Sequence, residues 1–357
     1  MQPRRTIWLF AAASLLPALC ILAGALLGGL WPLAALLSIT LLVLAMDRFG
    51  TDFEGHVSLN RWLPSTVALA HFGTLGFTLW AIGQNGALDW GQKFALGIAM
   101  GLYAGQVSNS CAHELIHRPD RAARWLGTAV YCSILNGQHV SAHLLVHHVH
   151  AGTAKDPCSA PLGRGYYRFL VSGVRQEFLA GWRAESARRR QVSRGVHPYA
   201  IYLAASVFSL FAAWVLGSFV GVTAFALIAV HAQMQLLLSD YVQHYGLRRT
   251  LRTDGKALPM GPEHSWNAPQ AYSAAMMMNA PRHSDHHLHP ARTFPHLELK
   301  PEEMPTLPYS LPVMGAIALV PPLWRTVMDP RVRLWSAATK PVRQSTPSGL
   351  STSVMSR

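Results

Sequence analysis

Residues 94–117 read FALGIAMGLYAGQVSNSCAHELIH, a long apolar run that ends in two histidines. Its first part, Phe94–Cys111, is an apolar run long enough to cross a bilayer as one helix. Immediately after it come His113 and His117, which a continuing helix places on one face, one turn apart. Because imidazole is the commonest neutral ligand for transition metals, the stretch predicts a membrane helix that presents two metal ligands at its end.

Further histidines repeat this pattern along the chain. One cluster reads HLLVHH over 143–148 and another reads HSDHH over 283–287, while His244 follows a second long apolar run. A lone histidine is usually a packed or hydrogen-bonded residue, but nine at these spacings predict a metal site, and nine are too many for one tetrahedral zinc. We therefore expect two metal ions of higher coordination number. The candidate ligands are His113, His117, His143, His147, His148, His244, His283, His286 and His287.

The composition indicates an integral membrane protein. Of 357 residues, 50% are hydrophobic and only 13% are charged, whereas soluble domains carry about 25% charged residues. The net charge of +13 does not predict a nucleic-acid partner, because the aromatic residues lie mostly in apolar segments and no nucleic-acid-binding motif is present. The four cysteines form no CxxC pair and are expected to be free thiols.

Hydropathy predicts an all-α membrane bundle of six transmembrane helices with a histidine-rich cap. Short glycine-containing turns join the first span to the second and the fifth to the sixth, which predicts helical hairpins. We expect a single domain over residues 1–340 and a disordered tail over 341–357. The predicted spans are 7–27, 30–46, 63–82, 94–111, 199–217 and 219–238.

The basic residues predict which side of the membrane carries the histidines. Of 30 Lys and Arg, only Lys93 lies on the side of the three short connections, so the positive-inside rule places both termini and all nine histidines in the cytoplasm. The cytoplasmic cap would comprise residues 112–198 and 245–340. Its basic run, Arg183–Arg190, predicts either a helix against anionic lipid headgroups or a docking surface for an acidic electron-transfer protein.

Other polar residues near the clusters are candidates for supporting roles. Glu114, Asp156 and Asp285 could accept the outer N–H of ligand imidazoles; the alternative is a helix cap or a salt bridge to Arg118, Lys155 or Arg282. His71 has no cluster partner and is expected to pack or hydrogen-bond. The predicted walls of a substrate tunnel, whose polar members could instead join helices, are Leu102, Gln106, Asn109, Gln233, Leu237 and Asp240.

The three clusters resemble the HxxxH, HxxxHH and HxxHH boxes of the membrane fatty acid desaturase and hydroxylase superfamily. The stretch NAPRHSDHHLHPAR over 279–292 and QHYGL over 243–247 are most similar to the bacterial alkane 1-monooxygenase and xylene monooxygenase branch. The resemblance covers residues 60–300. It implies a non-haem di-iron centre held by the nine histidines in the bacterial inner membrane, and O2-dependent hydroxylation of a terminal or methyl carbon of a hydrocarbon that enters from the membrane lipid. It also implies rubredoxin or a ferredoxin-type protein, with its reductase, as electron donor.

Three other functions compete with this hypothesis. An acyl-lipid desaturase or hydroxylase would use the same chemistry, and His244 together with the 282–287 string RHSDHH argues against it. A metal transporter would place its ligands near the bilayer midplane, whereas these clusters lie at the ends of the spans. A haem-binding subunit would need paired histidines within spans and would leave the clusters without a role. His139, His150, His289 and His296 receive no role from the sequence.

Overall fold

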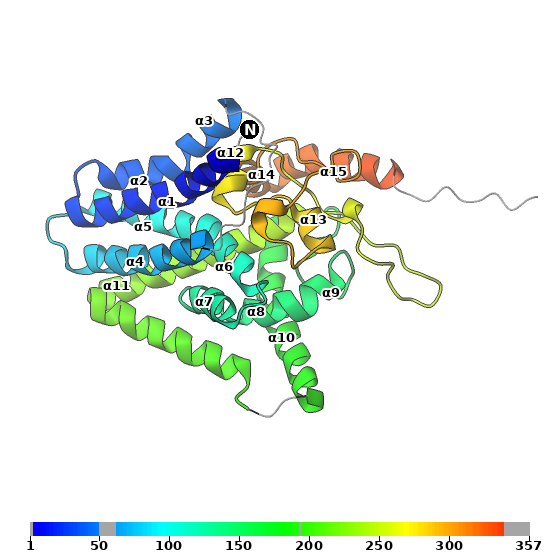
Figure 1. The fold of residues 1–357 in the computed structure, drawn as a ribbon, viewed down its shortest axis with the longest axis horizontal. Helices are drawn as coiled ribbons and strands as arrows, with labels where there is room; N and C mark the ends of the chain where they lie inside the picture. The colour runs from blue at the N-terminus through cyan, green and yellow to red at the C-terminus, as the bar shows by residue number, and fades with distance from the viewer. Residues whose placement is uncertain (1–2, 50–61, 193–194, 339–357) are drawn as a thin grey trace, which may run out of the picture.

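The computed structural model describes residues 3–49, 62–192 and 195–338. Within these ranges the chain is helical, apart from two isolated β-bridges, which confirms the predicted all-α class. Figure 1 shows the apolar helices side by side as a bundle and the remaining helices gathered at one end of it. The predicted tail over 341–357 lies outside the described residues. The bundle helices are α1 (Pro3–Leu27), α2 (Trp31–Ile39), α3 (Leu41–Phe49), α4 (Trp62–Gln84), α5 (Trp90–Tyr103) and α11 (Pro198–His244).

Among the described residues, three helical segments are long and apolar enough to cross a membrane: Ile7–Leu27, Trp62–Gln84 and Pro198–His244. The pair α2 and α3, bent by 40° between Ile39 and Leu41, makes a fourth if it counts as one span. The structure thus gives three or four candidates where six spans were predicted, and six remains a prediction. Helix α11 contains both the predicted fifth and sixth spans.

Helix α11 consists of two arms that meet at Ser218. This residue has φ 55° and ψ −154°, a conformation outside the helical region that L-residues rarely adopt. Figure 1 shows the two arms folding back from this bend. Gly217 beside the bend packs so closely on α4 that a Cβ at Gly83 would overlap its backbone. Two glycines therefore permit the close approach that holds the hairpin against α4.

Helix α5 leads directly into the histidine-bearing end of the bundle. It begins at a capping box, in which the Asp89 side chain accepts from the amide of Gln92 at 2.9 Å and Gln92 Oε1 accepts from the amide of Asp89 at 3.1 Å. The rod continues through a π-helical segment, η1 (Ala104–Ser108), into α6 (Asn109–Ile116). The predicted fourth span is thus divided among three helical segments.

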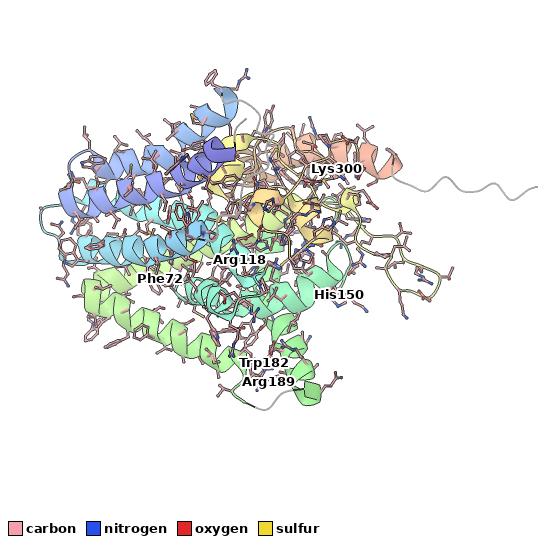
Figure 2. The ribbon with its side chains drawn as sticks, viewed as in Figure 1. Phe72, Arg118, His150, Trp182, Arg189 and Lys300 are labelled. Atoms are coloured by element: carbon pink, nitrogen blue, oxygen red, sulfur yellow. The ribbon has the colours of Figure 1, made fainter. Side chains whose placement is uncertain are left out.

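The remaining helices form the cap and come from the two predicted cap segments. The longest, α10 (Tyr166–Val192), packs against α8 and α11. Trp182 and Arg189 mark its outer part, where the basic run begins (Figure 2). The other cap elements are α7 (Arg121–Cys132), α8 (Gln138–Ala142), η2 (His143–His147), α9 (His148–His150), η3 (Pro262–His264), α12 (Ala271–Met276), α13 (His283–Leu288), η4 (Phe294–His296), α14 (Leu311–Ala318) and α15 (Pro321–Ala338).

Candidate metal centres

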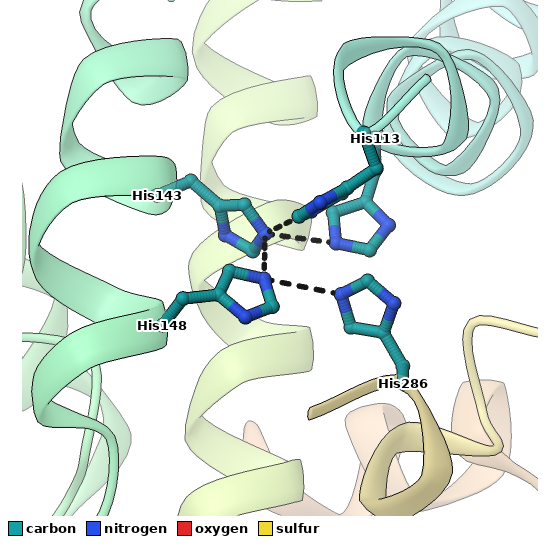
Figure 3. A group of neighbouring side chains, drawn as sticks. His113, His143, His148 and His286 are labelled. Atoms are coloured by element: carbon teal, nitrogen blue, oxygen red, sulfur yellow. Dashed lines mark hydrogen bonds between the residues drawn. The ribbon is translucent and has the colours of Figure 1, made fainter. Parts of the chain in front are cut away.

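The structure brings all nine predicted ligands together, and it sorts them into two groups. Within each group, one ring nitrogen from every histidine lies within 4.8 Å of all the others. Figure 3 shows four members of the larger group turning their rings toward one point between α6, the η2–α9 segment and α13. The larger group, called the five-histidine group, is His113, His117, His143, His148 and His286. The smaller one, the four-histidine group, is His147, His244, His283 and His287.

The grouping does not follow the sequence clusters. His143 and His148 join one group and the intervening His147 joins the other, while His286 and His287, which are neighbours in the chain, also separate. The cause in the first case is the π-helical segment η2, in which the His148 amide donates to the His143 carbonyl oxygen. A π turn brings residues five apart onto one face, as an α turn does for residues four apart. His147 therefore points toward the second group.

The donor set fits metal ions. In the five-histidine group, Nε2 of His143 lies 2.9 Å from Nε2 of His113, 3.0 Å from that of His117 and 2.9 Å from that of His148. A single imidazole nitrogen carries either one hydrogen or one lone pair, so it cannot form three hydrogen bonds at once. A shared cation resolves this arrangement, because each nitrogen then contributes its lone pair.

The four-histidine group shows the same geometry. Nε2 of His244 lies 2.9 Å from Nε2 of His283 and 3.2 Å from that of His287, and these last two are 3.0 Å apart. Nε2 of His147 is buried without any hydrogen-bond partner. Buried polar atoms are normally satisfied, so this orphan nitrogen is a candidate metal ligand.

The surroundings favour the neutral, metal-binding form of most of these rings. Burial, followed by the charge of neighbouring imidazoles, holds the pKa of His143, His283 and His287 well below the usual range. A neutral imidazole keeps the lone pair that a metal needs. Two groups of such rings, buried next to one another, could therefore each hold a divalent cation that prefers nitrogen ligands.

One predicted supporting carboxylate contacts a ligand histidine directly. Asp156 Oδ2 lies 3.0 Å from Nδ1 of His147, and it also accepts from the Ser159 hydroxyl at 2.6 Å. Burial disfavours the charged form of His147, yet the charge of Asp156 and its hydrogen bond raise the pKa of His147 to about 9. The carboxylate thereby fixes Nδ1 as the protonated nitrogen and turns a more basic Nε2 toward the site.

The contacts of Glu114 correct the role expected for it. Its carboxylate accepts from Arg118 at 2.9 and 3.1 Å and from the amide of Phe294 at 3.1 Å. Glu114 therefore forms the salt bridge with Arg118 that was the alternative to an imidazole contact, and its hydrogen bond to the Phe294 amide also connects α6 to η4. The i,i+4 spacing of Glu114 and Arg118 on one helix surface favours this pair.

Asp285 likewise contacts groups other than ligand histidines. It accepts from Arg292 at 2.8 and 2.9 Å, from Nδ1 of His289 at 2.8 Å and from the amide of Glu298 at 2.9 Å. Asp285 is nearly fully buried, and it joins α13 to the segment that follows it. It therefore supports the helix that carries three ligands without touching their rings.

Sequence reasoning missed a second buried imidazole–carboxylate pair. His139 Nδ1 lies 2.5 Å from Glu177 Oε1, and the His139 ring packs 5.1 Å from that of His143. The signal was present in the sequence, because His139 precedes His143 by four residues, as His113 precedes His117. His71, by contrast, behaves as predicted, since its two nitrogens contact the hydroxyls of Ser108 at 2.9 Å and Ser133 at 2.8 Å.

A cavity of about 250 Å³ runs from the bundle to the histidines. Its lining includes His113, His143 and His283 together with residues of α14. Four of the six predicted tunnel residues line it: Leu102, Gln106, Asn109 and Asp240. Gln233 and Leu237 are corrected, because they line a separate small hollow and the Gln233 amide donates to the Ile134 carbonyl at 2.9 Å. The lining by α14 was not predicted.

Comparison with known proteins places the chain in a family. The sequence model of the fatty acid desaturase family matches residues 88–318, a stretch that includes all nine histidines. The chain belongs to the fatty acid desaturase family. The two histidine groups and all the residues that line the cavity except Leu319 lie within the stretch that this family model matches.

The curated relatives of this desaturase-family chain share one name. Alkane 1-monooxygenase 1 of Pseudomonas aeruginosa is 32% identical over 271 residues, which cover 74% of this chain and 70% of the relative. Alkane 1-monooxygenase 2 of Alcanivorax borkumensis is 32% identical over 243 residues, covering 67% and 63%. Alkane 1-monooxygenase of Pseudomonas putida is 28% identical over 270 residues, covering 74% and 66%. Within the desaturase family, the chain belongs to the alkane 1-monooxygenase branch and is an oxygen-dependent oxidoreductase of that kind.

Proposed function

We propose that this protein is a non-haem di-iron monooxygenase that hydroxylates the terminal or methyl carbon of an alkane or alkyl-aromatic hydrocarbon. The observation that carries the proposal is the convergence of nine imidazole nitrogens on two points at the inner end of an apolar cavity. A hydrocarbon that partitions into the bilayer could enter between helices and present one end to the histidines. The names of the relatives support this choice of substrate.

The nine histidines would hold two iron ions, one in each group. When bound, the iron supplies the oxidising chemistry that an unactivated C–H bond requires and that zinc, with one accessible oxidation state, does not. The overall reaction takes up O2, two electrons and two protons, places one oxygen atom in the alcohol product and releases the other as water.

The protein itself orients the histidine rings and keeps water out of the cavity. Asp156 fixes the tautomer of His147, and the π turn of η2 directs adjacent histidines to different groups. Most of the surface exposed inside the cavity is apolar, although several polar residues also line it, so that water is a poor competitor for the space that the substrate occupies. The end of a hydrocarbon held next to His113, His143 and His283 would already be positioned and oriented for reaction. The entropy cost of aligning the reactants would then be met on binding.

We also propose the cytoplasmic membrane as the location, with both termini and the histidine groups on the cytoplasmic side. The distribution of Lys and Arg supports this orientation. Rubredoxin or a ferredoxin-type protein, with its reductase, would supply the electrons. Figure 2 places Arg189 at the outer part of α10, far from His150 beside the ligands, which favours lipid contact over donor docking for the basic run.

The test combines metal analysis with product analysis. The purified protein should contain about two irons per chain, as expected for two sites of four or five imidazoles. Cells that express it with a suitable donor should convert octane or xylene to the primary alcohol. Zinc in place of iron, or iron without any oxygenated product, would contradict the proposal. Unsaturated or hydroxylated acyl lipids as the main products would instead indicate the acyl-lipid alternative.

A further inference from the structure

Helix α10 (Tyr166–Val192) presents three different faces. The first packs on the rest of the protein, where α10 contacts α8 and α11. Its side chains are spaced three or four residues apart, which places them on one side of the helix. The residues of this buried face are Tyr166, Phe169, Gly173, Glu177, Gly181 and Glu185. The other sides of α10 face outward.

The second face is an apolar stripe that is exposed along about four turns of the helix. Its side chains also recur every three or four residues, and each is between 44% and 76% exposed. The apolar stripe consists of Tyr167, Val171, Val174, Phe178 and Trp182. Single apolar residues on a protein surface are ordinary, but a continuous row of them marks a contact with a partner or a membrane.

The third face is basic and lies directly beside the apolar stripe. Its exposed arginines recur at intervals of seven or eight residues, which is about two turns. This arginine row consists of Arg168, Arg175, Arg183 and Arg190. Three of its members directly follow a residue of the stripe, so the two rows lie about 100° apart around the helix. The acidic residues of α10, Glu177 and Glu185, are both only 5% exposed and belong to the buried face. The charge on the exposed side of α10 is therefore entirely positive.

One end of the apolar stripe lies beside the start of a candidate membrane span. The ring centroids of Phe178 and Trp182 are 5.2 and 5.1 Å from that of Tyr199, the second residue of α11. The turns of α11 that follow are exposed and apolar, as at Leu203 and Val207. Figure 1 shows α10 running across the direction of the bundle helices. The stripe therefore lies where a helix would enter the bilayer, and along its surface instead of through it.

The other end of the apolar stripe meets a second exposed apolar surface. The Tyr167 hydroxyl donates to the Leu319 carbonyl oxygen at 3.0 Å, between α14 and α15. Leu319, Val320 and Leu323 are 40% to 50% exposed. Exposed apolar side chains thus continue from α10 onto a neighbouring part of the cap. A bilayer is extended enough to cover both elements at once.

We propose that α10 lies in the interface of the membrane leaflet nearest the cap and binds anionic phospholipid. The apolar stripe enters the acyl region, the arginine row contacts lipid phosphates, and the buried face rests on the protein. A helix in the plane of a bilayer meets these three environments. An acidic protein would match the arginines, but the position of the stripe beside the start of α11 favours lipid. The proposal rests on the proposed membrane location and adds the segment of the cap that contacts the bilayer.

Cysteine labelling of the full-length protein in lipid nanodiscs tests the position of the stripe. Val171→Cys and Val174→Cys place thiols in the stripe, and Gln176→Cys is the matched control, at an exposed position on another side of the helix. The four native cysteines are buried. In discs of phosphatidylcholine and phosphatidylglycerol, a charged maleimide should label the stripe positions about tenfold more slowly than Gln176→Cys, because a charged reagent enters the acyl region poorly. Rates for the protein unfolded in SDS correct for intrinsic reactivity.

Two results would overturn the proposal. Equal rates at the three positions would show that the stripe faces water. Slow labelling of the stripe that appears only after addition of purified rubredoxin would assign the stripe to a protein partner. The labelling requires neither iron nor turnover, so its failure is distinguishable from a failure of the proposed function.

A second measurement tests the arginine row. Electron paramagnetic resonance compares how strongly the reconstituted protein restricts spin-labelled phosphatidylglycerol and spin-labelled phosphatidylcholine. We expect a preference for phosphatidylglycerol that falls about twofold in the double variant Arg175→Gln, Arg183→Gln, and that also falls at high salt. The double variant Arg252→Gln, Lys256→Gln removes the same charge from a loop that projects from the cap (Figure 1), and it should keep the preference. An equal loss in both double variants, or no preference in the unmodified protein, would refute the binding of anionic lipid by this row.

Discussion

The backbone amide of His148 donates to the carbonyl oxygen of His143, five residues earlier. This one hydrogen bond defines the π turn that aligns His143 with His148 and leaves His147 facing the other group. In an uninterrupted α-helix, His143 and His147 would share a face. The separation of one sequence cluster into two sites is therefore a local backbone property.

Replacing one histidine in either group should remove the iron bound by that group and leave the iron of the other group in place. His147→Ala removes a member of the four-histidine group, and His286→Ala removes a member of the five-histidine group. We expect each variant to retain about one iron per chain and to lose turnover, because a site built for four or five imidazoles binds weakly without one of them. Iron analysis and Mössbauer spectra of protein grown on 57Fe measure this.

His71→Ala is the matched control for those variants. His71 is buried, but its nitrogens contact Ser108 and Ser133 instead of a metal group. The variant should keep both irons while losing some thermal stability through its unsatisfied hydroxyls. Full turnover in His286→Ala, or loss of iron in His71→Ala, would refute the ligand assignment.

Asp156→Asn should weaken metal binding in the four-histidine group. The amide cannot replace the charge that raises the basicity of His147, and loss of such a partner typically costs 10- to 100-fold in metal affinity, roughly. Competition with a chelator measures the change. Asp285→Asn is the contrast, because Asp285 contacts Arg292 and His289. It should lower the unfolding temperature more than the metal affinity, and the reverse pattern would contradict our description of the two carboxylates.

A bulky side chain on the α14 wall of the cavity should exclude the longer hydrocarbons. Ala316 on α14 lines the cavity, and Ala316→Trp would fill with an indole some of the space that a long hydrocarbon needs. We expect turnover of hexadecane to fall more than tenfold, roughly, while octane is affected much less. Ala338→Trp, at the end of α15, should leave the ratio of the two rates unchanged. An equal loss for both hydrocarbons in Ala316→Trp would show that this part of the cavity does not hold substrate.

Gly83→Ala should destabilise the packing of α4 on the bend of α11. The added methyl would overlap the backbone of Gly217, and such overpacking typically costs about 1–3 kcal/mol. Gly73→Ala on the same helix is the matched control, because its Cβ would meet nothing within 4 Å and alanine favours the helix. Thermal unfolding in detergent measures both. A similar melting temperature for the two variants would argue against a tight contact between Gly83 and Gly217.

Much of the site could be predicted from residue type and spacing. Spacings of three and four residues on helices bring side chains to one face, so the histidine clusters were recognisable without a structure. The membrane character of the bundle and the hydrogen bonds of His71 were also predictable, because apolar length and the absence of neighbouring histidines are visible in the sequence.

What could not be predicted depends on tertiary contacts. Whether Glu114 would face an imidazole or Arg118 is decided by the packing of α6 against the segment at Phe294, 180 residues away. The pairing of His139 with Glu177 likewise joins distant helices. The division of HLLVHH between two groups requires a π turn, and spacing rules assume regular helix geometry.

The neighbours His147–His148 and His286–His287 have one further consequence. In each pair, one peptide unit connects a ring of one group to a ring of the other, whereas neither group includes a carboxylate that could span both. The backbone therefore links the two groups directly, through adjacent residues. Carboxylate bridges can swing as metals move, but a peptide plane has nearly fixed length. Because neighbouring Cα atoms stay about 3.8 Å apart, each pair anchors the two groups at adjacent backbone positions, and the spacing of the groups would be set when the chain folds and the rings pack.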